Sequence, residues 1–371
     1  MGDYVFAGTY TGAVFRTSDK GKQWTLVKPW APTLAVHAFM PMGTRILTGT
    51  DNGLYESSDS GGTWNLSSNY ISRIRALATD GQNLFMGASG FAVYTSSLGA
   101  KDWRSLDSSY FGHTVWSLAL TDSMIYAGTL GEGVIRSRKV GAGRKLSYCG
   151  PTAESTVNSL VVVGSTIVAG PHGDVVYFST NGGDSWTPAT RGVLFPDVRA
   201  FAIMGTRLFA GTLGGGVFVS TDTGKSWQAK NSGLMNLAVL DIIVSGSDLF
   251  VGTDDGVFKS SDSGDSWVSV SNGLTPVGSL DGSSGWMISL DQNYPNPFNP
   301  STTISYSLPK TAIVSLTIFN ALGQEIAVLV NEQRLPGYYQ RQWHANVPSG
   351  IYFYRLQAGV NVETKKMILL R

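Results

Sequence analysis

Short stretches in which apolar and polar residues alternate recur along most of the chain. Residues 198–230 contain four of them, VRAFAIM, TRLFAGT, GVFVST and SWQAK, separated by turn sequences such as LGGG and DTGK. Stretches of four to seven residues with Gly, Asn or Asp between them are typical of β-hairpins. No segment has the periodicity of an amphipathic helix. The pattern therefore predicts an all-β protein built from four-stranded units.

The four-stranded unit repeats at a nearly constant interval. A glycine in segments such as VFAGTY marks it, and the marker glycines, 38 to 42 residues apart, are Gly8, Gly49, Gly87, Gly128, Gly170, Gly211 and Gly252. Seven repeats of this length predict a seven-bladed β-propeller, and a linear β-solenoid, whose coils are usually much shorter, is the alternative. We expect an incomplete first blade, because nothing before DYVFAGTY matches the first stretch of the other repeats.

A second motif follows the same spacing. The segment SSDSGGTW at residues 57–64 has near-copies at 17–24, 179–186, 220–227 and 260–267, while the third repeat lacks the acid and the fourth lacks the tryptophan. The motif could bind a cation, supply a catalytic acid or build a turn. A calcium loop needs ligands at alternating positions, and the stretch Asp59-Ser60-Gly61 offers one. A structural turn is favoured, with the acid accepting hydrogen bonds, glycine at positive φ and tryptophan packing on the neighbouring blade.

This motif resembles the Asp-box, or BNR repeat. The resemblance covers repeats one, two, five, six and seven, and it is shared with sialidases, xyloglucanase-like glycosidases, sortilin-like receptors and photosystem-assembly propellers. It is specific for the fold and says little about function. The structural residues that it implies are Asp19, Trp24, Asp59, Trp64, Asn181, Trp186, Asp222, Trp227, Asp262 and Trp267.

A second module follows the repeats. Residues 1–274 are predicted to form the propeller, and the Gly/Ser-rich residues 275–290 to form a linker. Prolines in NYPNPFNPSTTISYSLP (293–309) argue against a helix or a central strand there. The alternating runs AIVSLTIFN, EIAVLV, YYQRQW, GIYFYRLQ and ETKKMILL then predict a small antiparallel β-sandwich, immunoglobulin-like in scale.

Residues 291–371 closely resemble the type A C-terminal sorting domain of the type IX secretion system. The matching segments are QNYPNPFNPSTTI, NALGQ, PSGIYFYRL and the terminal KKMILLR. The resemblance implies that this domain interacts with the type IX secretion machinery. It also implies an extracellular or cell-surface location on a Gram-negative bacterium. Export of this kind requires a signal peptide, and MGDYVFAGTY does not resemble one, so we expect the chain to be truncated at its N-terminus.

Composition narrows the range of partners. Only 14% of the residues are charged, the net charge is +1, and Lys and Arg form no run, which argues against nucleic acid as a partner. Cys149 is the only cysteine, so no disulfide can form within the chain. No apolar run reaches the roughly 18 residues that a transmembrane helix needs. His37, His113 and His172 follow no chelating pattern, and neither a metal nor a cofactor is expected.

Candidate binding residues come from comparing the repeats with one another. Positions that are alike in every blade are scaffold, whereas positions that differ are free for function. One variable position lies between two uniform ones at the start of each innermost strand, at His37, Arg75, Trp116, Asn158, Arg199 and Leu240. The turns between second and third strands add Tyr10, Asp51, Glu132, His172, Asp174, Asp254 and Asp255, and the loops between blades add Trp30, Tyr70, Tyr110, Phe111 and Phe195. We expect these side chains to surround the mouth of the propeller channel.

Polar groups of both signs together with aromatic side chains indicate non-catalytic binding of a protein or a glycan. The alternative is a sialidase- or xyloglucanase-like glycoside hydrolase, which would need a pair of carboxyl groups. Glu132 with Asp174, or Asp51 with Asp254 or Asp255, could supply the pair. The Arg-Ile-Pro element and arginine triad of sialidases are not found, and xyloglucanase-like enzymes use two propellers. Binding is therefore the favoured function.

Overall fold

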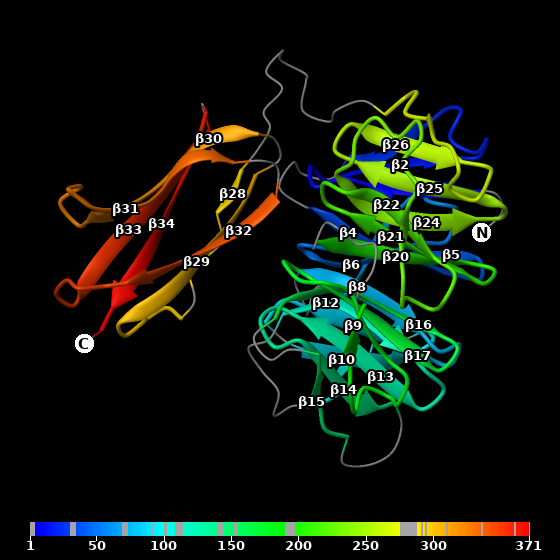
Figure 1. Ribbon diagram of the computed structural model, residues 1–371, viewed down its shortest axis with the longest axis horizontal. Coiled ribbons are helices and arrows are strands. Elements are labelled where there is room, and N and C mark those ends of the chain that lie inside the picture. The colour runs from blue at the N-terminus through cyan, green and yellow to red at the C-terminus, as the bar shows by residue number, and fades with distance from the viewer. Residues whose placement is uncertain are drawn as a thin grey trace. The chain divides into compact units, whose positions relative to one another are not determined.

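The computed structural model in Figure 1 describes the chain except for residues 1–3, 30–34, 69–72, 91, 100–101, 108–113, 140–143, 152–154, 190–196, 275–287, 291, 294, 309–310, 335–336, 360 and 371. Two compact units are present, Met1–Leu280 and Asp281–Arg371. The boundary falls within the predicted linker, most of which lies outside the described residues. Among the residues described, no helix has the length and apolar character needed to cross a membrane.

The first unit contains seven antiparallel sheets, numbered here in chain order, and the strands of each sheet lie side by side in sequence order. Sheet 1 has three strands, β1 (Val5–Gly8), β2 (Ala13–Thr17) and β3 (Thr25–Pro29). Sheet 2 contains β4 (Val36–Met42), β5 (Arg45–Thr50), β6 (Gly53–Ser57) and β7 (Asn65–Ser68). Sheet 3 contains β8 (Ile74–Thr79), β9 (Asn83–Ala88), β10 (Ala92–Ser97) and β11 (Arg104–Ser105). Sheet 4 contains β12 (Val115–Leu120), β13 (Met124–Thr129), β14 (Val134–Arg138) and β15 (Ser147–Gly150). Sheet 5 contains β16 (Val157–Val163), β17 (Thr166–Pro171), β18 (Tyr177–Ser179) and β19 (Thr187–Pro188). Sheet 6 contains β20 (Val198–Met204), β21 (Arg207–Thr212), β22 (Gly216–Ser220) and β23 (Gln228–Ala229). Sheet 7 contains β24 (Val239–Ser245), β25 (Asp248–Thr253), β26 (Gly256–Ser260) and β27 (Val268–Ser269).

The seven sheets form a ring. The first strands of consecutive sheets contact one another, β4 with β8, β8 with β12, β12 with β16, β16 with β20 and β20 with β24, so these strands are innermost. Hydrophobic residues gather in seven clusters, one between each pair of neighbouring sheets, including the pair formed by sheets 7 and 1. The all-β, seven-bladed propeller predicted from the repeats is therefore confirmed. Sheet 1 has no fourth strand among the described residues, as the repeat pattern predicted.

The marker glycines allow neighbouring sheets to approach closely. In six of the seven sheets, a Cβ added at this position would overlap the Val or Ile that begins the innermost strand of the next sheet. At Gly211, for example, an added Cβ would lie 2.5 Å from Cγ1 of Val239. The absence of a side chain is thus a packing requirement at the sheet–sheet interface, which explains why glycine recurs there.

The turn that contains the repeated acid is closed by its own hydrogen bonds. Asp59 Oδ1 accepts hydrogen bonds from Ser57 Oγ and from the Thr63 backbone N–H, both at 2.8 Å. Ser57 Oγ in turn accepts from the Gly61 N–H at 2.8 Å. Ser60 and Gly61 both have positive φ, 58° and 82°. Bonds from Thr63 and Ser57 lower the pKa of Asp59 to about 2. Equivalent bonds recur at the other four turns, around Asp19, Asn181, Asp222 and Asp262.

The repeated tryptophans connect neighbouring sheets in three of the five turns. The indole Nε1 of Trp24, Trp186 and Trp267 donates to the carbonyls of Val270, Cys149 and Lys230, each in the preceding sheet. Trp64 and Trp227 instead donate to the glycine carbonyl of their own turns. Because Val270 follows sheet 7, the bond from Trp24 closes the ring between its first and last sheets.

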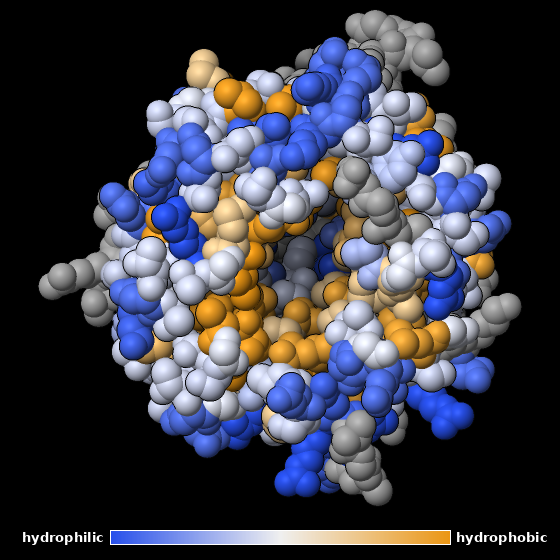
Figure 2. Space-filling view, turned by 90° about the vertical axis from the view of Figure 1, so that its right-hand side faces the viewer, coloured by the Kyte–Doolittle hydropathy of each residue, from blue (hydrophilic) through white to orange (hydrophobic). Residues whose placement is uncertain are grey.

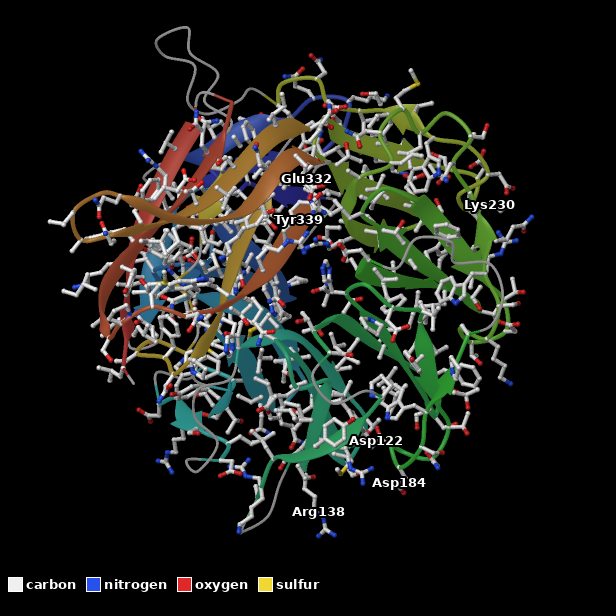
Figure 3. The ribbon with its side chains drawn as sticks, turned by 60° about the vertical axis from the view of Figure 1, so that its left-hand side comes forward. Asp122, Arg138, Asp184, Lys230, Glu332 and Tyr339 are labelled. Carbon is white, nitrogen blue, oxygen red and sulfur yellow. The ribbon has the colours of Figure 1, made fainter. Side chains whose placement is uncertain are left out.

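Ion pairs on the outer rim join two of the same pairs of sheets. Arg136 of sheet 4 pairs with Asp184 of sheet 5 at 2.6 Å, and Lys230 of sheet 6 pairs with Asp265 of sheet 7. Figure 3 shows Asp184 and Lys230 at the periphery of the ring. Such exposed pairs contribute little each, about 0–1 kcal/mol, so the apolar interfaces carry most of the stability.

The second unit is a β-sandwich. Its smaller sheet has the order β28 (Ser289–Leu290), β29 (Ser301–Leu308) and β32 (Gly337–His344). Its larger sheet has the order β31 (Glu325–Arg334), β30 (Ala312–Asn320), β33 (Gly350–Ala358) and β34 (Asn361–Leu369). One hydrophobic core, which includes Tyr306 and Trp343 from the smaller sheet and Leu316 and Tyr354 from the larger, lies between them. Within the smaller sheet, Tyr306 stacks on Tyr339, which is labelled in Figure 3.

One expectation for this unit was wrong. The prolines of residues 293–309 argued against a central strand, but β29 is the middle strand of the smaller sheet. Pro295, Pro297 and Pro300 precede the strand and Pro309 follows it, so no proline interrupts its hydrogen bonds. Ser289 and Leu290, assigned to the linker from the sequence, form β28.

Candidate functional site

The variable position at the start of each innermost strand is a β-bulge. The pairing register shifts across His37, Arg75, Trp116, Asn158, Arg199 and Leu240, so that each of these residues is the extra one in its strand. A bulge releases its residue from the regular alternation of the strand and redirects the side chain. The uniform residues on either side keep the sheet packed, which explains why only this position varies from blade to blade.

The first group of candidate residues comes from sheets 2, 3 and 4. His37 Nε2 lies 2.8 Å from Asp51 Oδ1, and Asp51 Oδ2 accepts from the Ala35 N–H at 3.1 Å. The guanidinium of Arg75 lies 4.1 Å from the centre of the Trp116 ring, a cation–π contact that covers one face of the indole. Burial, aided by the charge of Arg75, lowers the pKa of His37, so the imidazole is neutral near pH 7.

The second group is centred on Asp197, immediately before β20. Its carboxylate accepts hydrogen bonds from Asn158 Nδ2 at 2.8 Å and from Arg199 Nη2 at 3.0 Å. His172 Nδ1 lies 3.2 Å from Asp197 Oδ2. Burial raises the pKa of Asp197, but the bond from His172 and the charge of Arg199 outweigh it, so the pKa lies below its usual value. Four polar side chains from sheets 5 and 6 are thus held in one network.

Asp197 was missed by the sequence comparison. It lies immediately before the uniform Val198, one position outside the uniform–variable–uniform pattern of the repeats. The signal that could have found it is its position, two residues before Arg199, at the place where the chain enters the innermost strand. Asn158, His172 and Arg199 were all identified, and Asp197 is the residue that brings them together.

Sheet 7 contributes carboxylates that, among the described residues, are not paired with a histidine in the way that Asp51 and Asp197 are. Asp254 is half-buried, and burial, aided by the charge of Asp255, raises its pKa to about 6. Asp255 is exposed and accepts a hydrogen bond from Asn236 Nδ2 at 2.7 Å. The carboxyl of Asp241 is accessible to solvent yet surrounded by protein atoms, and this desolvation raises its pKa. Among the described residues, the positive charge of Arg199 opposes the shift at Asp254.

The remaining candidates are placed as follows. Asp174 accepts hydrogen bonds from the Val175 N–H at 2.7 Å and from the Tyr177 hydroxyl at 3.0 Å, so it braces its own turn. Glu132 is half-buried in the turn before β14, and the Tyr10 ring meets that of His37 edge-on at 6.3 Å. Five aromatic candidates lie outside the described residues, namely Trp30, Tyr70, Tyr110, Phe111 and Phe195.

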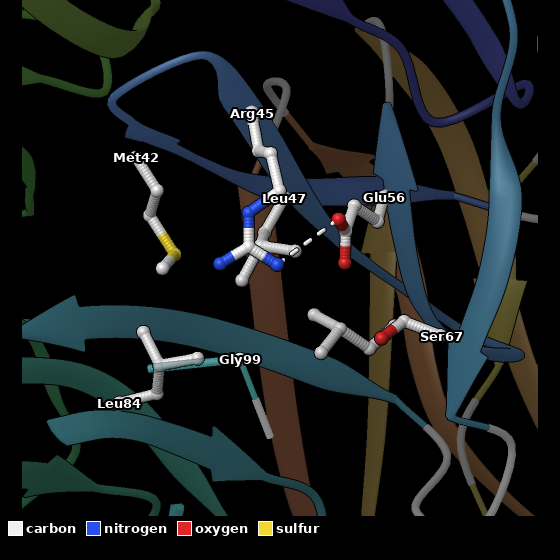
Figure 4. A pocket seen from close by; sticks show the side chains of 8 residues that line it. Met42, Arg45, Leu47, Glu56, Ser67, Leu84 and Gly99 are labelled. Carbon is white, nitrogen blue, oxygen red and sulfur yellow. Dashed lines mark hydrogen bonds and ion pairs between the residues drawn. The ribbon is translucent and has the colours of Figure 1, made fainter. Parts of the chain in front are cut away.

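Two hollows appear on the surface of the first unit. Figure 2 looks onto one face of the ring and shows a hollow at its centre with hydrophobic residues on its walls. Figure 4 shows a small crevice between sheets 2 and 3, in which Arg45 pairs with Glu56 at 3.1 Å above Leu84. None of the candidate residues lines this crevice. Within the described part of the chain, no three His, Cys, Asp or Glu side chains are placed to hold a metal ion.

A first prediction concerns Asp254. Its pKa is higher in the folded protein than in the unfolded chain, so the contribution of Asp254 to stability is greatest below about pH 4 and is lost as the pH rises through 6. We expect Asp254→Asn to raise the free energy of unfolding at pH 8 by about 1–2 kcal/mol, a value reduced for partial exposure to solvent. Urea unfolding at pH 4 and pH 8 measures the effect.

The control for Asp254 is Asp122→Asn, in an exposed turn on the rim (Figure 3). It should change stability by less than about 0.5 kcal/mol at either pH. An Asp254→Asn variant with equal gains at pH 4 and pH 8 would show that the charge of this carboxylate is not the cause.

Comparison with known proteins gives a family match for most of the second unit and structural matches for the fold. Residues 292–370 match the family described as the secretion system C-terminal sorting domain. No curated protein matches the chain. Among solved structures, PorZ of Porphyromonas gingivalis, a surface component of the type-IX secretion system, matches with a TM-score of 0.55 and 16% identity over 100% of this chain and 58% of PorZ.

Two other solved structures show the same fold. The extracellular domain of the two-component system BT4673 from B. thetaiotaomicron matches with a TM-score of 0.52 and 16% identity, over 82% of this chain and 44% of that one. YCF48 bound to D1 peptide matches with a TM-score of 0.51 and 15% identity, over 68% and 87%. This chain spans about half the length of PorZ and of BT4673. The chain therefore folds as a β-propeller followed by a β-sandwich, and residues 292–370 match a secretion system C-terminal sorting domain.

Proposed function

We propose that this chain is a cell-surface or secreted binding protein of a Gram-negative bacterium, in which the sandwich directs export and the propeller binds a ligand without catalysis. The sorting-domain match over residues 292–370 supports interaction of the sandwich with the type IX machinery. The likeness to PorZ, a bacterial surface component, agrees with a location at the cell surface. The five hydrogen-bonded turns support the Asp-box resemblance.

Buried donors at the predicted mouth are the observation that carries the binding role. Trp116 Nε1 and Arg199 Nε are buried, and neither has a hydrogen-bond acceptor among the described residues. A buried N–H without an acceptor costs about 1–3 kcal/mol, so such groups are expected to find a partner. Both belong to bulge residues of innermost strands, in sheets 4 and 6. We expect these two side chains to turn toward a bound ligand rich in acceptor oxygens, such as a glycan or an extended peptide.

The binding role predicts a specific effect of Trp116→Phe. This change removes the N–H donor but keeps a ring on which Arg75 can rest. For any glycan or peptide retained from an array by the full chain, we expect the dissociation constant to rise about tenfold, the value of one buried hydrogen bond. Calorimetric titration of the retained compound measures it.

Trp103→Phe is the matched control, because Trp103 Nε1 is also buried without an acceptor among the described residues but lies outside the candidate set. It should leave the dissociation constant unchanged. Equal effects of the two substitutions, or an array on which the chain retains nothing, would argue against a binding site at the mouth.

A glycoside hydrolase is the second candidate, and the raised pKa of Asp254 favours it. A carboxyl with a pKa of about 6 could act as a general acid near neutral pH. The predicted carboxylate pairs support it less well, because Asp174 is bonded to its own turn and Asp51 to His37. If the intact chain hydrolysed chromogenic glycosides, and Asp254→Asn or Glu132→Gln abolished this activity, the propeller would be an enzyme and not a non-catalytic binding protein.

A further inference from the structure

The second unit has charged residues inside one edge of its sandwich. This edge is formed by β31, an edge strand of the larger sheet, and β32, an edge strand of the smaller sheet. Glu332 of β31 lies opposite the buried Val314, and Arg341 of β32 lies opposite the buried Ile304. Residues directly opposite each other in a strand pair have their side chains on the same face of the sheet. Both charged side chains therefore point into the space between the two sheets, where the hydrophobic core would otherwise continue.

Three further side chains belong to this polar group. Arg334 lies two residues after Glu332 on β31, so its side chain is on the same face. Its Nη2 donates to Glu332 Oε1, and its guanidinium lies 5.1 Å from the centre of the Tyr339 ring. Tyr339 in turn stacks on Tyr306, its partner residue on β29. Glu332 Oε1 also lies 3.9 Å from Arg341 Nη2, so two guanidinium groups share one carboxylate.

Two hydrogen-bond donors of the group are buried without an acceptor. Tyr306 is 0% exposed, and among the described residues neither its hydroxyl nor Nε of Arg334 has a partner. Burial raises the pKa of Tyr306, so the hydroxyl keeps its proton and can donate. The positive charges of Arg334 and Arg341 partly offset this rise in pKa, so both guanidinium groups lie within electrostatic range of the hydroxyl. Buried donors without an acceptor are unfavourable, so these two are expected to find one.

The charge of the group and the open edge indicate what the acceptor is. Two guanidinium groups and one carboxylate leave one positive charge, which a singly charged anion balances. Among the described residues no further strand covers β31 or β32, and the side chains of Glu332 and Arg341 are 55% and 42% exposed. An anion can therefore enter from solvent. A carboxylate has a single charge and two acceptor oxygens that match the donors of a guanidinium group.

We infer that this edge of the sandwich binds a carboxylate group, which accepts hydrogen bonds from the Tyr306 hydroxyl and from Nε of Arg334. Its source is a small free carboxylate or an acidic side chain of an extended peptide, because both present the same two oxygens. The alternative is that the inward charges only prevent the edge strands from pairing with other chains. The inference goes beyond the proposed function and does not depend on the ligand of the mouth.

Nuclear magnetic resonance of the full chain, isotopically labelled in its arginine side chains, tests the inference. The Nε–H signal of Arg334 is identified by its loss in Arg334→Lys. Sodium acetate at neutral pH should shift this signal in a saturable way, whereas sodium chloride at the same concentration should not. Tyr306→Phe removes one of the two donors and should raise the dissociation constant of acetate about tenfold, the value of one buried hydrogen bond.

The two sources are distinguished with a short peptide, blocked at both ends, that has Glu at its centre. If this peptide binds at least about tenfold more tightly than acetate, the carboxylate comes from an acidic segment. Equal affinities of the peptide and acetate indicate a small free carboxylate. The same peptide with Gln in place of Glu should not shift the Arg334 signal in either case.

Two matched variants serve as controls. Tyr354→Phe also removes a buried tyrosine hydroxyl from this core, but that hydroxyl accepts a hydrogen bond from the Asn293 N–H at 2.8 Å. It should lower the melting temperature, whereas Tyr306→Phe, without carboxylate, should keep or raise it. Arg355→Lys, at an exposed arginine that lies over Phe319, should leave acetate binding unchanged. The inference is overturned if neither acetate nor the Glu peptide shifts the signal, if Tyr306→Phe binds acetate as tightly as the original chain, or if the Gln peptide binds as well as the Glu peptide.

Discussion

Gly49→Ala is expected to destabilise the propeller strongly, whereas Gly252→Ala is expected to have almost no effect. A Cβ at Gly49 would lie 2.6 Å from the Ile74 carbonyl oxygen and 2.7 Å from its Cγ2. The oxygen belongs to the backbone of β8, so the overlap can be relieved only by moving sheet 3 away from sheet 2. We expect a loss of about 2–4 kcal/mol and a melting temperature lower by roughly 5–10 °C, measured by calorimetry.

Gly252 is the matched control for Gly49. It occupies the same position in its own repeat, and neither glycine has positive φ, so alanine fits both backbones. At Gly252 none of the described residues lies within 4 Å of the added Cβ, and the change should remain within about 0.5 kcal/mol. Equal losses for the two variants would mean that the ring is as tightly packed at sheet 7 as elsewhere.

The fold could be predicted because repetition amplifies weak signals. A single segment such as VFAGTY is an ambiguous short strand, but seven copies at one spacing define both the unit and its number. The glycine that marks the repeat is the residue that packing constrains most, since a side chain there would overlap the next sheet. The second unit has no repeats, and there the prolines that bracket β29 were mistaken for prolines within it.

The candidate site could be predicted only in part. Comparison of the repeats identified all six bulge residues, because the bulge keeps its place in every innermost strand. It did not identify Asp197, which lies one position outside the uniform–variable–uniform pattern. It also could not distinguish Asp174, which braces its own turn, from Asp254, which has no such bond to a described residue, because both are acids in equivalent turns. The network at Asp197 depends on contacts between sheets, which a single repeat does not encode.

Trp24→Ala is expected to open the ring at the junction of its first and last sheets. Trp24 is 2% exposed, packs with Phe15, Phe250 and Val257, and donates from Nε1 to the Val270 carbonyl at 2.6 Å. Truncation of a buried aromatic side chain costs about 3–5 kcal/mol. The loss should be local, because sheet 1 has three strands among the described residues and none of these is an innermost strand that would hold it against sheet 7. Amide hydrogen exchange should therefore accelerate in β1–β3 at denaturant concentrations that leave β12–β15 protected.

Trp227→Ala is the control for Trp24→Ala, because it removes an equally large buried side chain away from the junction of sheets 1 and 7. Trp227 is 6% exposed in the interface between sheets 5 and 6, and its Nε1 donates to Gly224 within its own turn. Its loss should cost a similar free energy, but both neighbouring sheets have four strands, so exchange should rise without release of sheet 1. Trp24→Phe keeps most of the apolar contact and should cost about 1–2 kcal/mol. If Trp24→Ala and Trp227→Ala gave the same exchange pattern, sheet 1 would be held in the ring by something other than its contact with sheet 7.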